Sequence, residues 1–381
     1  MTKSVITEAL RPIELHQVDR LALSQKLEAA LSRVTRKLDN NIVAFGDKFP
    51  GEACEKGVWP RTENVEWTTS FWPGQLWLAW EMTGKAHYRE AAERYLPSFA
   101  RRIEQRIDTA THDLGFLYSL SCISAWRLTG NEAARRSALL AAERLMERFN
   151  PTARIIQAWG DLNDPEQQGR MIIDCNMNLP LLYWASEQTG DPRYAQAATA
   201  HAGQAANYIV REDASTYHTW YMDVQTGEPR FGNTHQGYSD TSCWSRGQAW
   251  GIYGFLLSYQ HTGDKQMVEL SRSLAHYSST ACRKMTFATG IWRCSVPTPC
   301  ATVQRRRLPP VACWSWSRRC RRSTQTARIM KRWRCVLRCR SPITTLLTTT
   351  IRPKGCCSTR FTIWAAVRAS ISAVAGGTIS I

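Results

Sequence analysis

Residues 278–381 contain no aspartate or glutamate, and they also lack asparagine, histidine and tyrosine. All 32 acidic residues lie in residues 1–277, beside 29 of the 49 basic ones, so the net charge of +17 comes from the C-terminal part alone. Nine of the 13 cysteines also follow Tyr277. We therefore divide the chain into a domain of ordinary globular composition, 1–277, and a basic tail rich in Cys and Trp, 278–381.

The residue types missing from the tail share a property of their codons. All five have A as the second base, whereas the over-used Arg, Cys, Trp, Ser, Thr, Pro, Ala and Gly have G or C there. Regrouping the bases of ATVQRRRL (301–308) permits RDSSAAAA, and regrouping GGTIS (376–380) permits WGDYF. We interpret the tail as translated out of frame, with a one-base slip near Tyr277–Ser278, and we expect it to be disordered.

Two other interpretations of the tail are weaker. A basic segment with interspersed Trp, such as 313–340, is typical of nonspecific polyanion binding, but it indicates no specific nucleic acid. Cys320, Cys335 and Cys339 have no histidine nearby and form no pair of C-x2-C motifs. A zinc site, which needs four well-placed ligands, is therefore not favoured.

Residues 1–277 also lack the segments that direct a chain into or across a membrane. The N-terminal MTKSVITEALRPIELHQVD has no apolar stretch typical of a signal peptide, and no apolar run reaches the roughly 20 residues of a membrane span. Only four cysteines occur in this part. We therefore expect a cytoplasmic protein without a membrane partner.

The domain contains a repeated pattern that predicts an all-α fold. Thr-Gly pairs end four apolar runs, at Gly84, Gly130, Gly190 and Gly263, and amphipathic runs follow them. Glycine just after an apolar run is a helix C-cap signal, because it adopts the left-handed conformation without a Cβ penalty. The pattern predicts helical hairpins, arranged as a bundle, a solenoid or a closed α/α toroid.

Polar residues recur at the start of the first helix of each hairpin. Asp113, Asp174 and Arg246 precede the next Thr-Gly pair by 16, 15 and 16 residues. These offsets place them at one end of parallel helices, where helix N-termini favour an anionic ligand. Aromatic rings beside carboxylates and an arginine are typical of a sugar-acid site. The same end is expected to hold His112, His235, Gln236, Trp72, Trp244 and Trp250.

Each of these residues also has a structural interpretation. An aspartate at a helix start is commonly an N-cap. The tryptophans can belong to the core, and His112 and His235 can be buried, hydrogen-bonded histidines. His201 and His218 are interpreted as structural. The convergence of four motifs favours a site over these alternatives.

At these motifs the sequence resembles the unsaturated glucuronyl hydrolases of glycoside hydrolase family 88. The similar text comprises W-T-x-x-F-W, H-D-x-G-F-L-Y-S-L, I-I-Q-A-W-G, I-I-D-C-x-x-N-L-P-L-L, Y-H-T and T-H-Q-G…W-x-R-G-Q-A-W-G-I-Y-G-F, within about residues 40–277. The resemblance implies an (α/α)6 toroid, here incomplete because the closing hairpins are missing. It also implies hydration of the C4=C5 double bond of an unsaturated uronic acid at the non-reducing end of lyase-generated oligosaccharides.

The resemblance also implies roles for individual residues. It makes Asp174 the general acid/base and Asp113 a second required carboxylate, and it implies no cofactor and no metal. His112, Trp72, His235, Gln236, Arg246 and Trp250 match site-lining positions, and Trp244 is included as a substrate-binding residue. Three alternatives stay open: a rhamnogalacturonyl-type hydrolase, a non-catalytic sugar-binding protein and a pseudogene product. The oligomeric state is not indicated.

Overall fold

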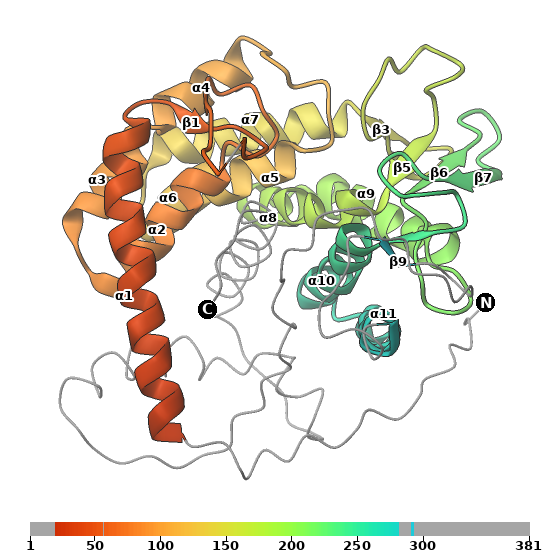
Figure 1. Cartoon of the computed structure of the whole chain (residues 1–381). Helices are drawn as coiled ribbons and strands as arrows, with labels where there is room; N and C mark the ends of the chain where they lie inside the picture. Colours follow the sequence, from red (N-terminus) through yellow and green to blue (C-terminus); the bar gives the residue numbers. More distant parts are fainter. Residues whose placement is uncertain (1–19, 56, 282–290, 293–381) are drawn as a thin grey trace.

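The computed structural model describes residues 20–281, with the exception of Lys56, together with residues 291–292. Helices dominate this part and follow one another around an arc (Figure 1). The first helices of the hairpins are α2 (Phe71–Thr83), α5 (Leu114–Tyr118) continued by the π-helix η2 (Ser119–Ile123) and α6 (Ser124–Thr129), α8 (Leu179–Thr189) and α10 (Ser245–Thr262). The others are α1 (Arg20–Phe45), α3 (Ala86–Glu93), α4 (Leu96–Glu104), α7 (Glu132–Met146), α9 (Pro192–Gln204), η4 (Ala205–Ile209) and α11 (Lys265–Ala281).

The predicted Thr-Gly turns are confirmed at all four positions. Gly84, Gly130, Gly190 and Gly263 are the C-caps of α2, α6, α8 and α10, with φ between 73° and 75°. The threonine before each glycine donates its hydroxyl to the carbonyl four residues earlier, as Thr83 does to Ala79 at 2.7 Å. Helix ends are thus determined locally, by a residue that tolerates positive φ.

The two helices of a hairpin differ in burial. Helix α2 buries Trp72, Leu76 and Trp77 almost completely and more than half of its residues in all, and α8 is buried in the same way. A helix that is apolar on all sides requires neighbours on all sides. Helices such as α7 and α9 instead bury an alanine-rich stripe and expose charged residues. The first helices therefore lie inside the fold, and the second ones cover them.

Short antiparallel strands connect the hairpins. The largest sheet has the order β5-β6-β7, with Arg170–Ile172, Thr219–Met222 and Pro229–Asn233. It confirms a strand within TYHTWYMDV (216–224), whereas SVITEALRPIEL (4–15) lies outside the described residues. The remaining pairs are β1 (Phe49–Pro50) with β2 (Arg61–Thr62), β3 (Phe149–Asn150) with β4 (Ile155–Ile156), and β8 (Cys243–Trp244) with β9 (Ile291–Trp292).

Helix α10 supports the short 3-10 helix η3 (Ile173–Met177) through glycines on one face. Gly247, Gly251 and Gly254 recur with helical spacing, and a Cβ on Gly254 would lie 2.4 Å from Cβ of Asn176. A Cβ on Gly247 would come within 3.1 Å of Ile173, at the other end of η3. Only residues without a side chain let the two backbones approach so closely, so α10 fixes the position of η3.

Most of the predicted disordered tail, 278–381, lies outside the described residues. Two short parts of it are described, and both are regular. Helix α11 continues without interruption to Ala281, and Ile291–Trp292 pairs with Cys243–Trp244. Tyr277 is therefore not the end of regular structure. No helix in the described ranges is long and apolar enough to cross a membrane.

Candidate active site

Asp174 lies where strand β5 passes into η3. The backbone N–H of Ile173 donates to the carbonyl of His218 at 3.1 Å, which extends the pairing of β5 with β6 by one residue. Asp174 follows in the first turn of η3, with 14% of its side chain exposed. Its Oδ2 atom is buried and has no hydrogen-bond partner in the described part of the chain. A carboxyl group held in this way is poised to exchange a proton with a ligand.

Burial raises the pKa of Asp174 to about 7. Arg246 opposes this effect by favouring the ionised form, and the negative charge of Asp113 adds to it. The indole of Trp250 also favours the ionised form, although its N–H makes no hydrogen bond of standard geometry with the described residues. The raised pKa keeps part of the Asp174 population protonated at neutral pH, which suits a general acid.

Asp113 precedes helix α5 without capping it. Its side chain makes no capping hydrogen bond, which argues against the purely structural interpretation. Instead Oδ2 accepts the hydroxyl of Thr111 at 2.7 Å, and Oδ1 lies 3.4 Å from Nε2 of His112. Since Asp113 contributes to the raised pKa of Asp174, the two carboxylates share one region of the fold, as predicted.

His112 is buried beside Asp113 and is held by the backbone. The backbone N–H of His112 donates to the carbonyl of Ala158 at 2.7 Å, and the ring Nδ1 atom has no partner among the described residues. Burial lowers the pKa of His112, and the charge of Asp113 only partly offsets this. The ring is therefore neutral at pH 7 and can donate or accept a hydrogen bond without carrying charge.

His218, which we interpreted as structural, lies beside Asp174. Its Nδ1 atom accepts the backbone N–H of His235 at 2.9 Å and that of Gln236 at 3.3 Å. Burial lowers the pKa of His218 to about 3, so the ring is neutral and its proton must be on Nε2. This Nε2 lies 4.0 Å from Oδ2 of Asp174. The motif Y-H-T was the signal in the sequence, but only the strand pairing shows its importance.

His201, also interpreted as structural, fits that interpretation. Its Nδ1 atom accepts the backbone N–H of Ile156 at 2.9 Å, and burial lowers its pKa to about 3. It is fully buried. A neutral histidine that closes one backbone hydrogen bond serves the packing of α9 against β4.

Arg246 provides the positive charge of the site. It lies in the first turn of α10, where Nη2 donates to Oε1 of Gln236 at 2.5 Å, and its guanidinium lies 4.3 Å from the ring centroid of Trp244. Burial lowers the pKa of Arg246, and the charge of Asp174 opposes this. The same guanidinium is 5.8 Å from the ring of Trp67. A partly buried arginine between aromatic faces suits a carboxylate ligand.

The structure separates the two tryptophans of W-T-x-x-F-W. Trp72 is buried in the core, where its indole N–H donates to Tyr95 at 2.8 Å and its ring packs on Phe45. The position of Trp72 therefore does not support the predicted contact with a substrate. Trp67, which we had not selected, approaches Arg246 instead and donates to Glu52 at 3.2 Å. Helix α2 begins at Phe71, so Trp72 faces inward while the preceding turn carries Trp67 to the site.

The remaining predicted residues lie around Asp174. The ring of Trp250 packs on Phe116 at 5.3 Å, in the same apolar cluster as Trp244. His235 is exposed, and its ring lies 5.2 Å from Trp159 and 6.3 Å from His218. Of the predicted set, the structure therefore brings together Asp113, Asp174, His112, His235, Gln236, Trp244, Arg246 and Trp250, and leaves Trp72 in the core.

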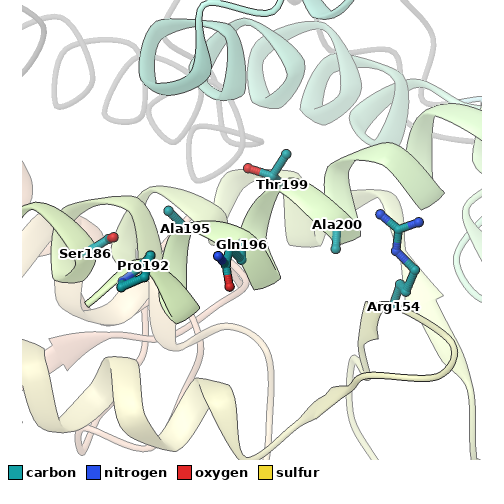
Figure 2. Close-up of a pocket in the computed structure, with 7 residues that line it drawn as sticks. All are labelled: Arg154, Ser186, Pro192, Ala195, Gln196, Thr199 and Ala200. Carbon is teal, nitrogen blue, oxygen red and sulfur yellow. The ribbon is translucent and has the colours of Figure 1, made fainter. Parts of the chain in front are cut away.

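A separate pocket of about 440 Å³ shares no residue with this cluster. Figure 2 shows it along helix α9, with Ser186 of α8 at one end and Arg154 at the other. Its lining consists of Arg154, Ser186, Pro192, Ala195, Gln196, Thr199 and Ala200. Within the described ranges, no group of three His, Cys, Asp or Glu side chains could hold a metal ion.

Known proteins match this chain over most of its described part. The "Unsaturated chondroitin disaccharide hydrolase" of Streptococcus pneumoniae is 40% identical over 277 residues, which cover 73% of this chain and 70% of that protein. The "Unsaturated glucuronyl hydrolase" of Bacillus sp. strain GL1 is 47% identical over 237 residues, or 62% of this chain and 63% of that protein. This chain thus spans less than two thirds of the length of the Bacillus relative.

Solved structures agree with the helical arrangement. The unsaturated glucuronyl hydrolase of Streptococcus agalactiae matches with a TM-score of 0.65 and 40% identity, covering 71% of this chain and 70% of that one. The Bacillus sp. GL1 enzyme matches with a TM-score of 0.68 and 36% identity, covering 89% and 82%. The arc of hairpins therefore has the α/α toroid fold predicted from the sequence.

The family described as Glycosyl Hydrolase Family 88 matches residues 44–302. The match continues past Tyr277, the residue at which we expected the similarity to end. It covers more than half of the chain and includes every motif that carries the candidate site. Together with the relatives and the fold, it assigns the chain to an enzyme family: the protein belongs to glycosyl hydrolase family 88.

Proposed function

We propose that the enzyme removes a 4,5-unsaturated uronic acid from the non-reducing end of an oligosaccharide by hydrating the C4=C5 double bond. The observation that carries this proposal is Asp174, a buried carboxyl group with a pKa of about 7 and one unpartnered oxygen, beside a second carboxylate and an arginine. The relatives in Streptococcus pneumoniae and Bacillus sp. are named for action on unsaturated chondroitin disaccharides and unsaturated glucuronyl groups, which supports the same substrate class.

The reaction begins with proton transfer from Asp174 to C4. The double-bond electrons form the new C4–H bond, which leaves positive charge shared by C5 and the ring oxygen. Water adds to C5 and gives up one proton to the Asp174 carboxylate, so the group ends in its starting state. The resulting hemiketal opens to a ketone at C5, and the hemiacetal left at C1 expels the aglycone. One water molecule is consumed, and no redox step occurs.

The neighbours of Asp174 account for its two protonation states, the acid and the carboxylate. The charge of Asp113 and the burial of the site favour the protonated acid, whereas Arg246 favours the carboxylate formed after protonation of C4. We assign Arg246, at the N-terminus of α10, to the substrate carboxylate. Trp244 and Trp250 form apolar walls, His112, His235 and Gln236 bind hydroxyl groups, and His218 positions Asp174.

Turnover in heavy-oxygen water tests the mechanism. Hydration places the label on C5 of the released uronate, whereas direct glycosidic hydrolysis places it on C1. Asp174→Asn keeps size and polarity but cannot deliver a proton, so the rate should fall roughly 10²- to 10⁴-fold. Label on C1, or full activity of Asp174→Asn, contradicts the proposal. Binding of the sugar without any turnover would favour the non-catalytic alternative.

We also propose that residues 278–381 are read out of frame, after a one-base slip near Tyr277–Ser278. The absence of all five A-second-base residue types after Tyr277 supports this. The nucleotide sequence around codons 275–280 is the test. A one-base slip that restores acidic residues downstream supports the proposal, whereas an intact frame with ordinary codon usage throughout 278–381 contradicts it. We propose a cytoplasmic location as well, which is supported by the free cysteines of the described residues, Cys54, Cys122, Cys175 and Cys243.

A further inference from the structure

The three-stranded sheet beside the site carries an unusual row of side chains. Arg170, Tyr221 and Phe231 are directly opposite one another on β5, β6 and β7. Opposed residues on adjacent strands project from the same face. Nε of Arg170 donates to the Tyr221 hydroxyl at 2.9 Å, and the rings of Tyr221 and Phe231 stack at 4.8 Å with an interplanar angle of 22°. We call these three residues the sheet row.

The sheet row is connected to the candidate active site by further contacts. The guanidinium of Arg170 lies 5.0 Å from the ring centroid of Trp159, and Trp159 lies 5.2 Å from the ring of His235. His235 in turn donates its backbone N–H to His218, the neighbour of Asp174. The sheet row therefore extends from the candidate active site towards the edge of the sheet. Arg170 is also three residues before Ile173 in the chain, about 10 Å along an extended strand.

The far end of the row is open to solvent. Phe231 is 46% exposed on β7, which is an edge strand of the sheet (Figure 1). The guanidinium of Arg230 lies 5.5 Å from its ring. Within the described ranges, neither Arg170 nor Arg230 forms an ion pair with a carboxylate. The guanidinium of Arg230, the N–H groups of Arg170 that do not bind Tyr221 and an exposed aromatic face are thus available to a ligand that reaches this edge, while Asp164 and Asp223 offset part of the positive charge.

We propose that the sheet row, together with Arg230, binds the acidic sugars of the aglycone beyond the ring that is attached to the unsaturated uronate. Aromatic faces stack on the apolar faces of pyranose rings, and guanidinium groups pair with carboxylate or sulfate substituents. Phe231 lies two strands, roughly 10 Å, across the sheet from Arg170, which is itself about 10 Å along β5 from Ile173. The exposed end of the sheet row therefore acts on tri- and tetrasaccharides but not on disaccharides. The inference rests on the proposed function, because it assumes that the uronate occupies the site at Asp174.

The test measures binding of unsaturated acidic oligosaccharides to the full chain in an Asp174→Asn background, which prevents turnover. Tetrasaccharide should bind about tenfold more tightly than disaccharide, since two contacts of about 0.7 kcal/mol correspond to that ratio. Phe231→Ala and Arg230→Gln should each weaken tetrasaccharide binding by about threefold and leave disaccharide binding unchanged. Added salt should reduce the arginine contribution.

Three controls make the test specific. Phe231→Leu keeps apolar bulk but removes the ring face, so it should behave as Phe231→Ala does, whereas Phe231→Tyr should restore binding. Val43→Ala alters a side chain on α1 that is 82% exposed and should change neither ligand's affinity. Equal affinity for both ligands, equal weakening of both by Phe231→Ala, or no binding of either overturns the inference. If tetrasaccharide binds more tightly than disaccharide, but the parent protein with Asp174 intact turns over neither, the proposed function is contradicted and this inference is not.

Discussion

A Cβ atom on Gly115 would lie 2.2 Å from Cα of Asn178, so α5 and the end of η3 meet backbone against backbone. Oδ1 of Asn178 accepts the N–H of Phe116 at 2.6 Å and closes the contact. Asp113 immediately precedes α5, and Asp174 lies in η3. This junction therefore fixes the two carboxylates relative to each other, although 60 residues separate them in the sequence.

We expect Gly115→Ala to destabilise the protein by about 3 kcal/mol, because the added methyl group meets backbone atoms that cannot rotate away. Activity should fall as well, since α5 must move and carry Asp113 with it. Gly203→Ala is the matched control: nothing lies within 4 Å of its added Cβ in helix α9. It should be neutral or stabilising by up to about 1 kcal/mol. Urea denaturation measures the free energy of unfolding of both variants. Equal values would contradict the close backbone contact between Gly115 and Asn178.

Arg102 joins two loops that lead to the site. It is 2% exposed and donates to the carbonyls of Glu66 at 2.9 Å and Val65 at 3.0 Å on one loop, and to Ile107 at 3.2 Å on the other. The first loop leads to Trp67 and the second to Asp113. Removal of the Arg102 side chain leaves several partly buried carbonyls without donors.

Arg102→Met should therefore lower the free energy of unfolding by about 3–5 kcal/mol. Arg101→Met changes the exposed neighbour on the same helix and should shift it by less than about 0.5 kcal/mol. Thermal unfolding of the two variants provides the comparison. A similar melting temperature for both would show that Arg102 does not hold the loops.

Two substitutions can separate the roles of His218. In His218→Asn, the amide oxygen can replace Nδ1 as acceptor for the N–H groups of His235 and Gln236, but no donor faces Asp174. We expect kcat to fall roughly 10- to 100-fold with little change in KM. In His218→Gln, a donor can reach Asp174 but the loop loses its acceptor, so KM should rise. Steady-state kinetics of both variants would reveal identical profiles if His218 were only a packing residue.

The features predicted correctly from the sequence are those determined locally. Each Thr-Gly pair ends its helix because glycine adopts positive φ, whatever the surrounding fold. Asp113 and Asp174 share a region because they precede their Thr-Gly pairs by similar offsets, 16 and 15 residues, which places them at the same end of neighbouring helices. These predictions needed only helix periodicity and cap chemistry.

The features that the sequence did not predict depend on long-range contacts. The motif W-T-x-x-F-W contains two tryptophans, and their directions depend on where α2 begins, so Trp72 was selected in place of Trp67. His218 gained its importance from the pairing of β5 with β6 and from the loop at His235, which are distant in the sequence. Likewise, the pairing of Ile291–Trp292 with β8 lies beyond the boundary that composition placed at Tyr277.

The raised pKa of Asp174 predicts how stability depends on pH. The folded protein binds this proton more tightly than the unfolded chain does, since the pKa rises from 3.8 to about 7 on folding. The contribution of Asp174 to the free energy of unfolding is therefore greatest below pH 3.8 and is lost as the pH rises towards 7. The change is on the order of 4 kcal/mol.

Asp174→Asn isolates this contribution, because the amide does not titrate in this range. The stability of the parent protein minus that of Asp174→Asn should decrease between about pH 4 and pH 7 and stay constant above it. Asp113→Asn removes a charge that raises the pKa of Asp174 in the folded protein, so the decrease should end at a lower pH and be smaller. Denaturation curves at a series of pH values measure both effects. If the stability of the parent protein minus that of Asp174→Asn does not vary with pH, Asp174 titrates as an ordinary carboxylate. That result would remove the basis for the role of Asp174 as the acid at neutral pH.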